Sequence, residues 1–261
     1  MERTPPRTSR TNWRPAVAAR MTWTIATGLV VEFVVIGLSA VPGALLFRWA
    51  WQWAAPDPLV QTVAVCLLIA PSYVLFGIGM IVLSPAVARL LGWRTKPHVE
   101  MVISEAGWDL CNWARYIILT HLVDALVGHI LKTTPLWSVY LRLNGATLGR
   151  GVYVNSLGIV DHCLLEFGDH VIIGGGVRLS GHTVERGVVK TAPVRLGRGV
   201  TVGLDTIVGI GVEAGPGCQI GAMSLVPKFS KLEAGATYVG QPVVKVEKPD
   251  GVNGAGSGAT R

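Results

Sequence analysis

Residues 196–226 read LGRGVTVGLDTIVGIGVEAGPGCQIGAMSLV, and an aliphatic residue recurs at every sixth position of this stretch. Glycine follows most of these aliphatic residues, and a small or β-branched residue stands at the fifth position of each hexad. An inward aliphatic side chain, a glycine at the bend and a small residue at the corner make one short strand with its turn. Three hexads would close one triangular coil, so the stretch predicts a parallel β-helix. The aliphatic positions are Leu196, Val202, Val208, Ala214, Ile220 and Val226.

The hexad frame extends toward the N-terminus with two interruptions. It slips by a residue or two near Asp161, and 17 positions rather than 18 separate Leu179 from Leu196. The segment GHTVERGVVKTAPVR, before Leu196, contains no hexads, so we expect a loop to leave the β-helix there. Loops on a rigid scaffold often carry function, which makes this segment and VDHCLLEFGDH at the slip the places to look for a site. Upstream, the frame is kept by Leu148, Val154, Phe167, Ile173 and Leu179.

The N-terminal half has the composition of a membrane region. Hydrophobic residues make up 50% of the 261-residue chain, charged residues 15%, and the mean hydropathy is +0.47. Residues 22–47 contain one charge, Glu32, and residues 59–83 contain none. Each run exceeds the roughly 20 residues that cross a bilayer. A signal peptide has a shorter apolar run and no second span after it, so we expect two transmembrane helices.

The charges around the two spans predict their orientation. Five arginines and one acid precede residue 21, and Arg89, Arg94 and Lys96 follow the second span, so the positive-inside rule places both flanks in the cytoplasm. Residues 108–132 alternate apolar and polar residues near the helical period, which favours an amphipathic helix in the interface over a third span. Glu32 either has a role within the membrane or is protonated or capped there.

These patterns divide the chain into five regions. The β-helix is the only one with a repeat, and the segment GVNGAGSGATR at the C-terminus has no core-forming content. The predicted regions are a basic cytoplasmic tail (1–21), two transmembrane helices (22–83), a juxtamembrane or interfacial helical region (84–144), the β-helix (145–242) and a flexible tail (243–261).

Polar residues at the two interruptions could carry out chemistry. His182 falls on a hexad position that should face outward, next to the break and beside Thr183 and Glu185. A neutral imidazole can remove a proton from a hydroxyl or an amine near neutral pH, although a surface histidine in a polar loop is equally consistent with the pattern. Asp161 and His162 lie at the earlier interruption, where stacking of the coils would bring them to the same edge as His182.

A zinc site is the alternative chemistry. His162, His170 and His182 supply three imidazoles, but their spacing places them on different faces of one chain, so a neighbouring copy would have to complete the site. The four dispersed cysteines form neither a CxxC pair nor a disulfide framework. We therefore expect no metal, and a zinc-dependent β-helix enzyme is the less favoured alternative. The sequence also has no GxxxxGK[ST] motif for nucleotide phosphates.

The formal net charge of +7 has two sufficient explanations that do not involve nucleic acid. The N-terminal arginines suit anionic lipid, and basic residues of the β-helix suit a phosphate-bearing donor. We expect Lys190, Arg198 and Lys228 to bind that donor, with Arg195 and Lys231 near it.

The hexads over residues 148–242 resemble the left-handed β-helix acyltransferase superfamily. This resemblance implies a trimer with a histidine at the subunit interface and acyl-coenzyme A as donor. Four segments are similar, more narrowly, to the membrane-linked terminal domains of poly-lysine synthetases and related peptide synthetases, and this likeness includes the membrane half. The segments are TPLWSVYLRLNGATLGRGVYVNS (134–156), DHCLLEFGD (161–169), GHTVERGVVK (181–190) and SLVPK (224–228).

The narrower resemblance also implies the roles of individual residues. It assigns the catalytic histidine to His182, with Glu185 and Lys190 matching the acid and the base that follow it. Asp161 matches an acid of the preceding coil. The chain departs from this pattern because it lacks the Asp-Arg pair directly after the Glu and because its β-helix ends in GQPVVK rather than in a longer tail.

The sequence therefore predicts a multi-pass acyltransferase of the inner membrane, assembled as a homotrimer with its catalytic domain in the cytoplasm. His182 would deprotonate the amine or hydroxyl of a small-molecule, peptide or amino-acid acceptor. The donor of the acetyl or aminoacyl group would be acyl-CoA or a thioester on a carrier protein, and membrane lipid would be a further partner. A non-catalytic trimeric membrane scaffold is the alternative from another functional class.

Overall fold

The computed structural model describes residues 15–53 and 57–246. The chain forms two compact units, and neither is continuous in sequence. The helical unit contains the described residues up to Leu131 together with Val139–Gly145 and His182–Ala192. The β-helix unit contains Lys132–Ser138, Ala146–Gly181 and the described residues from Pro193 onward. Most arginines of the predicted basic tail lie outside the described residues.

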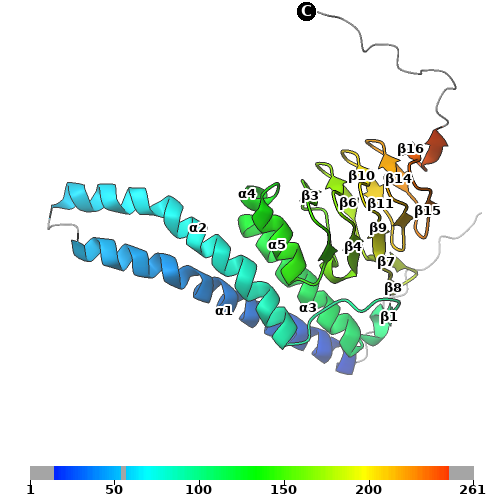
Figure 1. The fold of residues 1–261 in the computed structure, drawn as a ribbon. Coiled ribbons are helices and arrows are strands. Elements are labelled where there is room, and N and C mark those ends of the chain that lie inside the picture. Colours follow the sequence, from blue (N-terminus) through cyan, green and yellow to red (C-terminus); the bar gives the residue numbers. More distant parts are fainter. Residues whose placement is uncertain (1–14, 54–56, 247–261) are drawn as a thin grey trace, which may run out of the picture. The chain divides into compact units, whose positions relative to one another are not determined.

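The β-helix unit is built of three parallel sheets, and successive strands pass from one sheet to the next (Figure 1). Each circuit of the three sheets is one coil. The first sheet contains, in spatial order, β2 (Thr147–Leu148), β4 (Leu165–Phe167), β9 (Val194–Leu196), β12 (Glu213–Ala214) and β15 (Lys231–Leu232). The second contains β3 (Tyr153–Val154), β5 (Ile172–Ile173), β10 (Thr201–Val202), β13 (Gln219–Ile220) and β16 (Thr237–Val239). The third contains β6 (Arg178–Leu179), β11 (Ile207–Val208) and β14 (Leu225–Val226).

The register confirms the predicted repeat. Thr201 pairs with Gln219 and Glu213 with Lys231, so three hexads make one coil. The inward hexad residues from Val154 to Val226 are at most 5% exposed, and burial of each aliphatic side chain contributes roughly 1.5–3 kcal/mol. Gly203 shows why glycine follows the inward residue, because a Cβ there would lie 2.5 Å from the backbone nitrogen of the next coil. The predicted parallel β-helix is confirmed, whereas its left hand stays a prediction.

The two interruptions have different causes. Near Asp161 the coil is longer by one or two residues, since Thr147 pairs with Glu166 and Ile159 bridges to Leu179. The later interruption is an insertion, because paired strands there are separated by more than three hexads, as in Arg178 with Ile207. Without His182–Ala192, the segment that belongs to the helical unit, Arg178 and Ile207 would be three hexads apart. The stretch between Leu179 and Leu196 is therefore one hexad plus an insertion, not a coil that is short by one residue.

The C-terminal boundary of the β-helix differs from the prediction. The sequence pattern assigns residues 243–261 to a flexible tail, but Val244–Val246 form β17, which pairs antiparallel with β16. Val244 follows the Gln241–Pro242 turn, so a hairpin ends the second sheet. The rest of the predicted tail lies outside the described residues.

Two long helices, α1 (Pro15–Trp53) and α2 (Pro58–Leu90), run side by side in the helical unit (Figure 1). Small residues bring their backbones together: a Cβ on Gly79 of α2 would lie 2.9 Å from the Cα of Ser39 on α1. Such close approach of small residues is typical of helix packing in membranes. Both helices extend beyond the apolar runs found in the sequence.

A third helical stretch begins at Trp108 and consists of α3 (Trp108–Val123), a π-helical turn (Asp124–Gly128) and α4 (His129–Leu131). The Tyr73 hydroxyl of α2 donates to the Leu126 carbonyl within the π-helical turn, where the backbone departs from the usual hydrogen-bond ladder. By length and composition this stretch is apolar enough to cross a membrane, as α1 and α2 are. The sequence pattern favours an interfacial position for it, which stays a prediction. It is followed by α5 (Pro135–Leu143).

Candidate active site

The insertion that interrupts the β-helix is a hairpin. Its strands are β7 (His182–Glu185) and β8 (Val188–Thr191), which pair antiparallel across a turn at Arg186 and Gly187. Both turn residues have positive φ values, 49° and 80°, as a two-residue turn of the hairpin-forming type requires. The strand β8 also pairs with β1 (Glu100–Val102), so it becomes the central strand of a three-stranded sheet in the helical unit.

His182 begins β7 and lies against an aromatic ring from α3. The centroids of the His182 and Trp113 rings are 4.9 Å apart and the ring planes are inclined by 73°, an edge-to-face contact. His182 is half-buried. An edge-to-face contact restricts the imidazole to a narrow range of orientations.

Glu185 and Lys190 face each other across the hairpin. Lys190 Nζ lies 3.8 Å from Glu185 Oε2 and 3.5 Å from Oε1 of Glu100 on β1. The side chain of Lys190 is 40% exposed, so this three-residue cluster is a surface one. Lys190, predicted to bind a donor phosphate, therefore already has two carboxylates beside it.

Thr191, the last residue of β8, fastens the hairpin to the segment before β1. Its hydroxyl donates to the Lys96 carbonyl at 2.7 Å and accepts from the Val99 amide at 3.0 Å. Thr191 is 5% exposed, so both bonds are shielded from water. His182 pairs directly with Thr191 at this open end of the hairpin, so its position depends on strand pairing and on these side-chain bonds.

Within the β-helix unit, one edge collects several predicted site residues. We call this edge the insertion edge, and it carries the turns that lead from the third sheet to the first in successive coils. These turns are residues 160–164, 180–181 with 193, 209–212 and 227–230. Asp161 is fully buried there with a left-handed backbone, and the Ser180 hydroxyl donates to its Oδ2 at 3.5 Å. A Cβ on Gly181 would lie 2.9 Å from the Asp161 Cβ. Asp161 therefore lies at the point where the chain leaves the β-helix to form the hairpin.

The other predicted residues of the β-helix unit are spread over two edges. Lys228 is exposed on the insertion edge, two coils beyond Gly181. Arg198 is exposed in the turn after β9, which lies on the edge between the first and second sheets. Arg198 and Lys228 are therefore not neighbours within one β-helix, and two different chains would have to supply them to one phosphate group. His162 is fully buried with Nε2 3.0 Å from the Ile159 carbonyl, whereas His170 is exposed, as expected.

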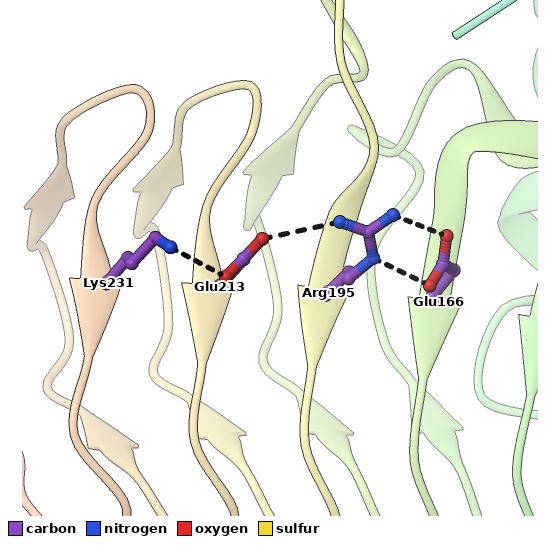
Figure 2. Close-up of polar contacts among 4 residues, drawn as sticks. All are labelled: Glu166, Arg195, Glu213 and Lys231. Atoms are coloured by element: carbon purple, nitrogen blue, oxygen red, sulfur yellow. Dashed lines mark hydrogen bonds and ion pairs between the residues drawn. The ribbon is translucent and has the colours of Figure 1, made fainter.

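The outer face of the first sheet carries a charge ladder that the sequence reasoning missed (Figure 2). Arg195 Nε donates to Glu166 Oε2 at 2.9 Å, and its Nη1 donates to Glu213 Oε1 at 3.3 Å. Lys231 Nζ lies 3.6 Å from Glu213 Oε2. The hydrogen bond with Glu166 raises the pKa of the Arg195 guanidinium. The signal was present in the sequence, since these residues each precede an inward residue of the same sheet.

The charge ladder changes the interpretation of two basic residues. The sequence places Arg195 and Lys231 near a phosphate-bearing donor, but in the structure they face glutamates on neighbouring strands. They line a shallow groove of about 610 Å³ on this face together with Glu166 and Glu213. With two acids and two bases, the groove has no excess positive charge to attract phosphate.

The described residues contain no group of three or more His, Cys, Asp or Glu side chains placed to hold a metal ion. Cys218 is fully buried within the β-helix, and this burial raises the pKa of its thiol. A protonated, enclosed thiol is a packing residue rather than a metal ligand.

One curated protein is similar to most of the chain. A delta-poly-L-ornithine synthetase of Acinetobacter baumannii (strain AB307-0294) is 22% identical over 188 residues, which are 71% of this chain and 14% of that protein. The chain thus corresponds to a small part of the synthetase's length. No family model matches the chain.

Solved structures that align with the chain do so at low identity and at TM-scores below 0.5. A hexapeptide-repeat acetyltransferase from Vibrio cholerae is 18% identical, with 40% of this chain and 62% of that chain covered and a TM-score of 0.37. A serine acetyltransferase from Neisseria gonorrhoeae is 18% identical, with 89% and 91% covered and a TM-score of 0.35. An N-acyltransferase from Bacillus cereus, solved with dTDP and 3-hydroxybutyryl-CoA, is 20% identical, with 40% and 73% covered and a TM-score of 0.32. The match to part of a poly-ornithine synthetase agrees with the predicted resemblance to peptide-synthetase-type proteins.

Proposed function

We propose that this chain is a membrane-anchored acyltransferase in which His182 is the general base. The observation that carries the proposal is the insertion of a hairpin, with His182 at its start, into an otherwise regular β-helix. A regular β-helix has no cavity inside its stacked core, so chemistry depends on such an insertion. The resemblance to the terminal domains of peptide synthetases assigns the same residue to catalysis.

The reaction joins an acceptor nucleophile to a thioester carbonyl. His182 takes a proton from the amine or hydroxyl of the acceptor, and the nitrogen or oxygen forms a bond to the carbonyl carbon. Backbone amides near the hairpin stabilise the oxyanion of the tetrahedral intermediate. The carbon–sulfur bond then breaks, and the leaving thiolate takes the proton from the imidazolium. The products are an amide or ester and a free thiol.

The neighbouring residues have supporting roles in this scheme. Trp113 holds the imidazole by its edge-to-face contact, and the cluster of Glu185, Lys190 and Glu100 keeps the hairpin closed. Asp161 fixes the backbone at Gly181, where the hairpin starts. Arg198 and Lys228 bind phosphates of the donor, each from a different chain of a homotrimer. This arrangement makes the site incomplete in a single chain.

Three further features belong to the proposal. The helices α1 and α2 cross the inner membrane, with the β-helix on the cytoplasmic side in accordance with the positive-inside rule. The donor is acyl-CoA or a carrier-protein thioester. The similarity to part of a poly-L-ornithine synthetase suggests an acceptor with a primary amine, such as an amino acid or a peptide.

The test compares His182→Gln with His170→Gln in the full chain purified in detergent. The assay measures thiol released from acetyl-CoA in the presence of ornithine, lysine or a short basic peptide. We expect His182→Gln to lower turnover by a factor of about 10² to 10⁴, the usual contribution of a general base. His170, an exposed histidine of a regular coil, is the matched control and should keep wild-type turnover.

Three outcomes would contradict the proposal. Equal turnover in His182→Gln and in the wild type would remove the base. Absence of thiol release with any thioester, from a protein that is folded and trimeric, would favour the scaffold. Stoichiometric zinc in the purified protein, with activity lost on its removal, would favour the zinc enzyme instead.

A further inference from the structure

The helical unit has an apolar groove that takes no part in the proposed chemistry. The groove has a volume of about 520 Å³ and is lined by Trp23, Ala26 and Val30 of α1 and by Leu91 and Trp93, which follow α2. Its remaining wall includes the side chain of Arg115, from α3. A cationic residue in an otherwise apolar groove needs a physical explanation.

Arg115 is only 5% exposed. Its Nε donates to the Thr27 hydroxyl at 3.0 Å and to the Thr24 carbonyl at 3.4 Å, and its Nη1 donates to Asn112 Oδ1 at 3.1 Å. All of these acceptors are uncharged. Within residues 15–53 and 57–246, no carboxylate lies within ion-pair distance of Arg115, and its Nη2 group makes no hydrogen bond. A guanidinium has five N–H donors, so this one keeps both charge and donors for a ligand.

The surroundings hold the guanidinium at the groove rather than letting it extend to water. Its carbon lies 5.5 Å from the centroid of the Trp93 ring, a cation–π contact. The stem of Arg115 packs over Gly28, where a Cβ would lie 3.9 Å from its Cγ. Holding an unpaired cation in an apolar environment costs free energy, and a bound anion from another molecule would lower that cost.

The groove lies close to the basic end of α1. Arg20 precedes Trp23 by about one helical turn, and the exposed Arg94 follows Trp93. From Thr24 to Val31 the helix rises about 10 Å, so the groove runs from this aromatic and basic level along the apolar part of α1. If α1 crosses the membrane as proposed above, Arg115 lies at the depth of the lipid headgroups and the rest of the groove lies at the depth of the acyl chains.

We infer that the groove binds an anionic phospholipid, with the phosphate on the Arg115 guanidinium and an acyl chain along Ala26 and Val30. The phosphate supplies the missing anion and accepts the free Nη2 hydrogens, and the apolar wall fits a hydrocarbon chain. A free phosphate ion would leave that wall exposed to water. This inference rests on the proposed membrane location but not on the proposed acyl transfer.

The test uses the full chain in a neutral detergent, titrated with short-chain phosphatidylglycerol and, separately, with short-chain phosphatidylcholine and inorganic phosphate. Binding is read from the emission of the tryptophans, two of which line the groove, and from the unfolding midpoint. We expect saturable binding of phosphatidylglycerol and at least about tenfold weaker binding in Arg115→Gln, because a charge-assisted contact is lost. Arg48→Gln, which removes a charge from the opposite end of α1, should bind as the wild type does.

A second variant keeps the test decisive if Arg115→Gln fails to fold. Ala26→Phe retains the arginine and fills the groove, and it should lose phosphatidylglycerol binding while keeping its unfolding midpoint without lipid. Four results would each overturn the inference. The first two are equal binding of the two lipids and equal binding in Arg115→Gln and Arg48→Gln. The others are full competition by inorganic phosphate and wild-type binding in Ala26→Phe. His182→Gln should bind phosphatidylglycerol as the wild type does, which separates this site from catalysis. Extraction of the chain from membranes by alkaline carbonate would refute the membrane location itself.

Discussion

The β-helix and the hairpin inserted in it both consist of short strands, but their strands find partners over different sequence distances. In the regular coils each strand pairs with the strand three hexads further on. The strand β8 of the hairpin pairs on its outer side with β1, where Lys190 lies opposite Glu100 from a distant part of the chain. A repeating local pattern is sufficient to build the first structure, whereas the second needs a partner that no local pattern specifies.

The two regions also differ in what they contribute. The coils bury at least one apolar side chain per hexad. The hairpin buries Val189 and Thr191, and it brings His182 to Trp113 and Lys190 to two acids. A rigid periodic scaffold therefore supplies stability, and an irregular insertion supplies the candidate chemistry.

Deletion of residues 182–192, with Gly181 joined to Pro193, separates these contributions most completely. The deletion leaves a coil of three hexads, so we expect the β-helix to fold, while transfer falls by about a hundredfold or more because the proposed general base is lost. Circular dichroism and thermal unfolding of the full chain measure the first effect, and thiol release measures the second. Loss of the β-sheet signal would mean that the hairpin is needed to close the coil.

Neighbouring residues on β5 test the predicted inward and outward positions. Ile173 is fully buried and Ile172 is 45% exposed. Ile173→Ala should lower the free energy of unfolding by about 2–5 kcal/mol because it leaves a cavity, whereas Ile172→Ala should change it by at most about 0.5 kcal/mol. Denaturant unfolding of the two variants gives the difference. Similar losses in both would show that the outer face of the second sheet is covered.

Substitution of Trp113 tests how the helical unit positions the hairpin. Trp113→Ala removes an aromatic contact of about 0.5–1.5 kcal/mol, which corresponds to a kcat about 2- to 10-fold lower with KM unchanged. Trp113→Phe keeps an aromatic edge and should restore most of the kcat. A change in KM alone, or no rescue by Phe, would indicate that Trp113 does not act through the orientation of His182.

The charge ladder should have the smallest effect. Arg195 is 46% exposed, so Arg195→Gln should cost at most about 1 kcal/mol of stability even though the side chain contacts two glutamates. The loss should shrink in high salt, because salt screens exposed pairs. Arg198→Gln, at an exposed position of the next turn, serves as the control. A salt-independent loss would mean that the ladder is buried in an assembly.

The fold of the β-helix could be predicted to within a residue or two, because the signal is local and repeated. Val202, Val208 and Ile220 occupy the interior as the six-residue spacing requires. The slip at Asp161 and the break after Leu179 were also visible as interruptions. The charge ladder could not be seen in the hexad pattern, because that pattern concerns the inward positions alone. The members of the ladder become adjacent only after the coils stack.

The candidate site was less accessible to prediction. The sequence pattern singles out His182, Glu185 and Lys190 within one segment, but it gives no reason to connect that segment with Glu100 or Trp113. It also groups Arg198 with Lys228, although the two lie on different edges. Arg115 carries no sequence signal, since an arginine in an amphipathic helix ordinarily faces water.

The hexads alone determine the coil, because each inward side chain and its glycine favour the same bend wherever they occur in the chain. The long apolar runs likewise predict α1 and α2, since runs of that length and composition are typical of helices that could span a membrane. Only the tertiary structure decided where the hairpin docks and which neutral groups surround Arg115, because strand pairing and burial of a charge depend here on residues far apart in the chain. Those long-range contacts locate the candidate chemistry and the groove beside Arg115.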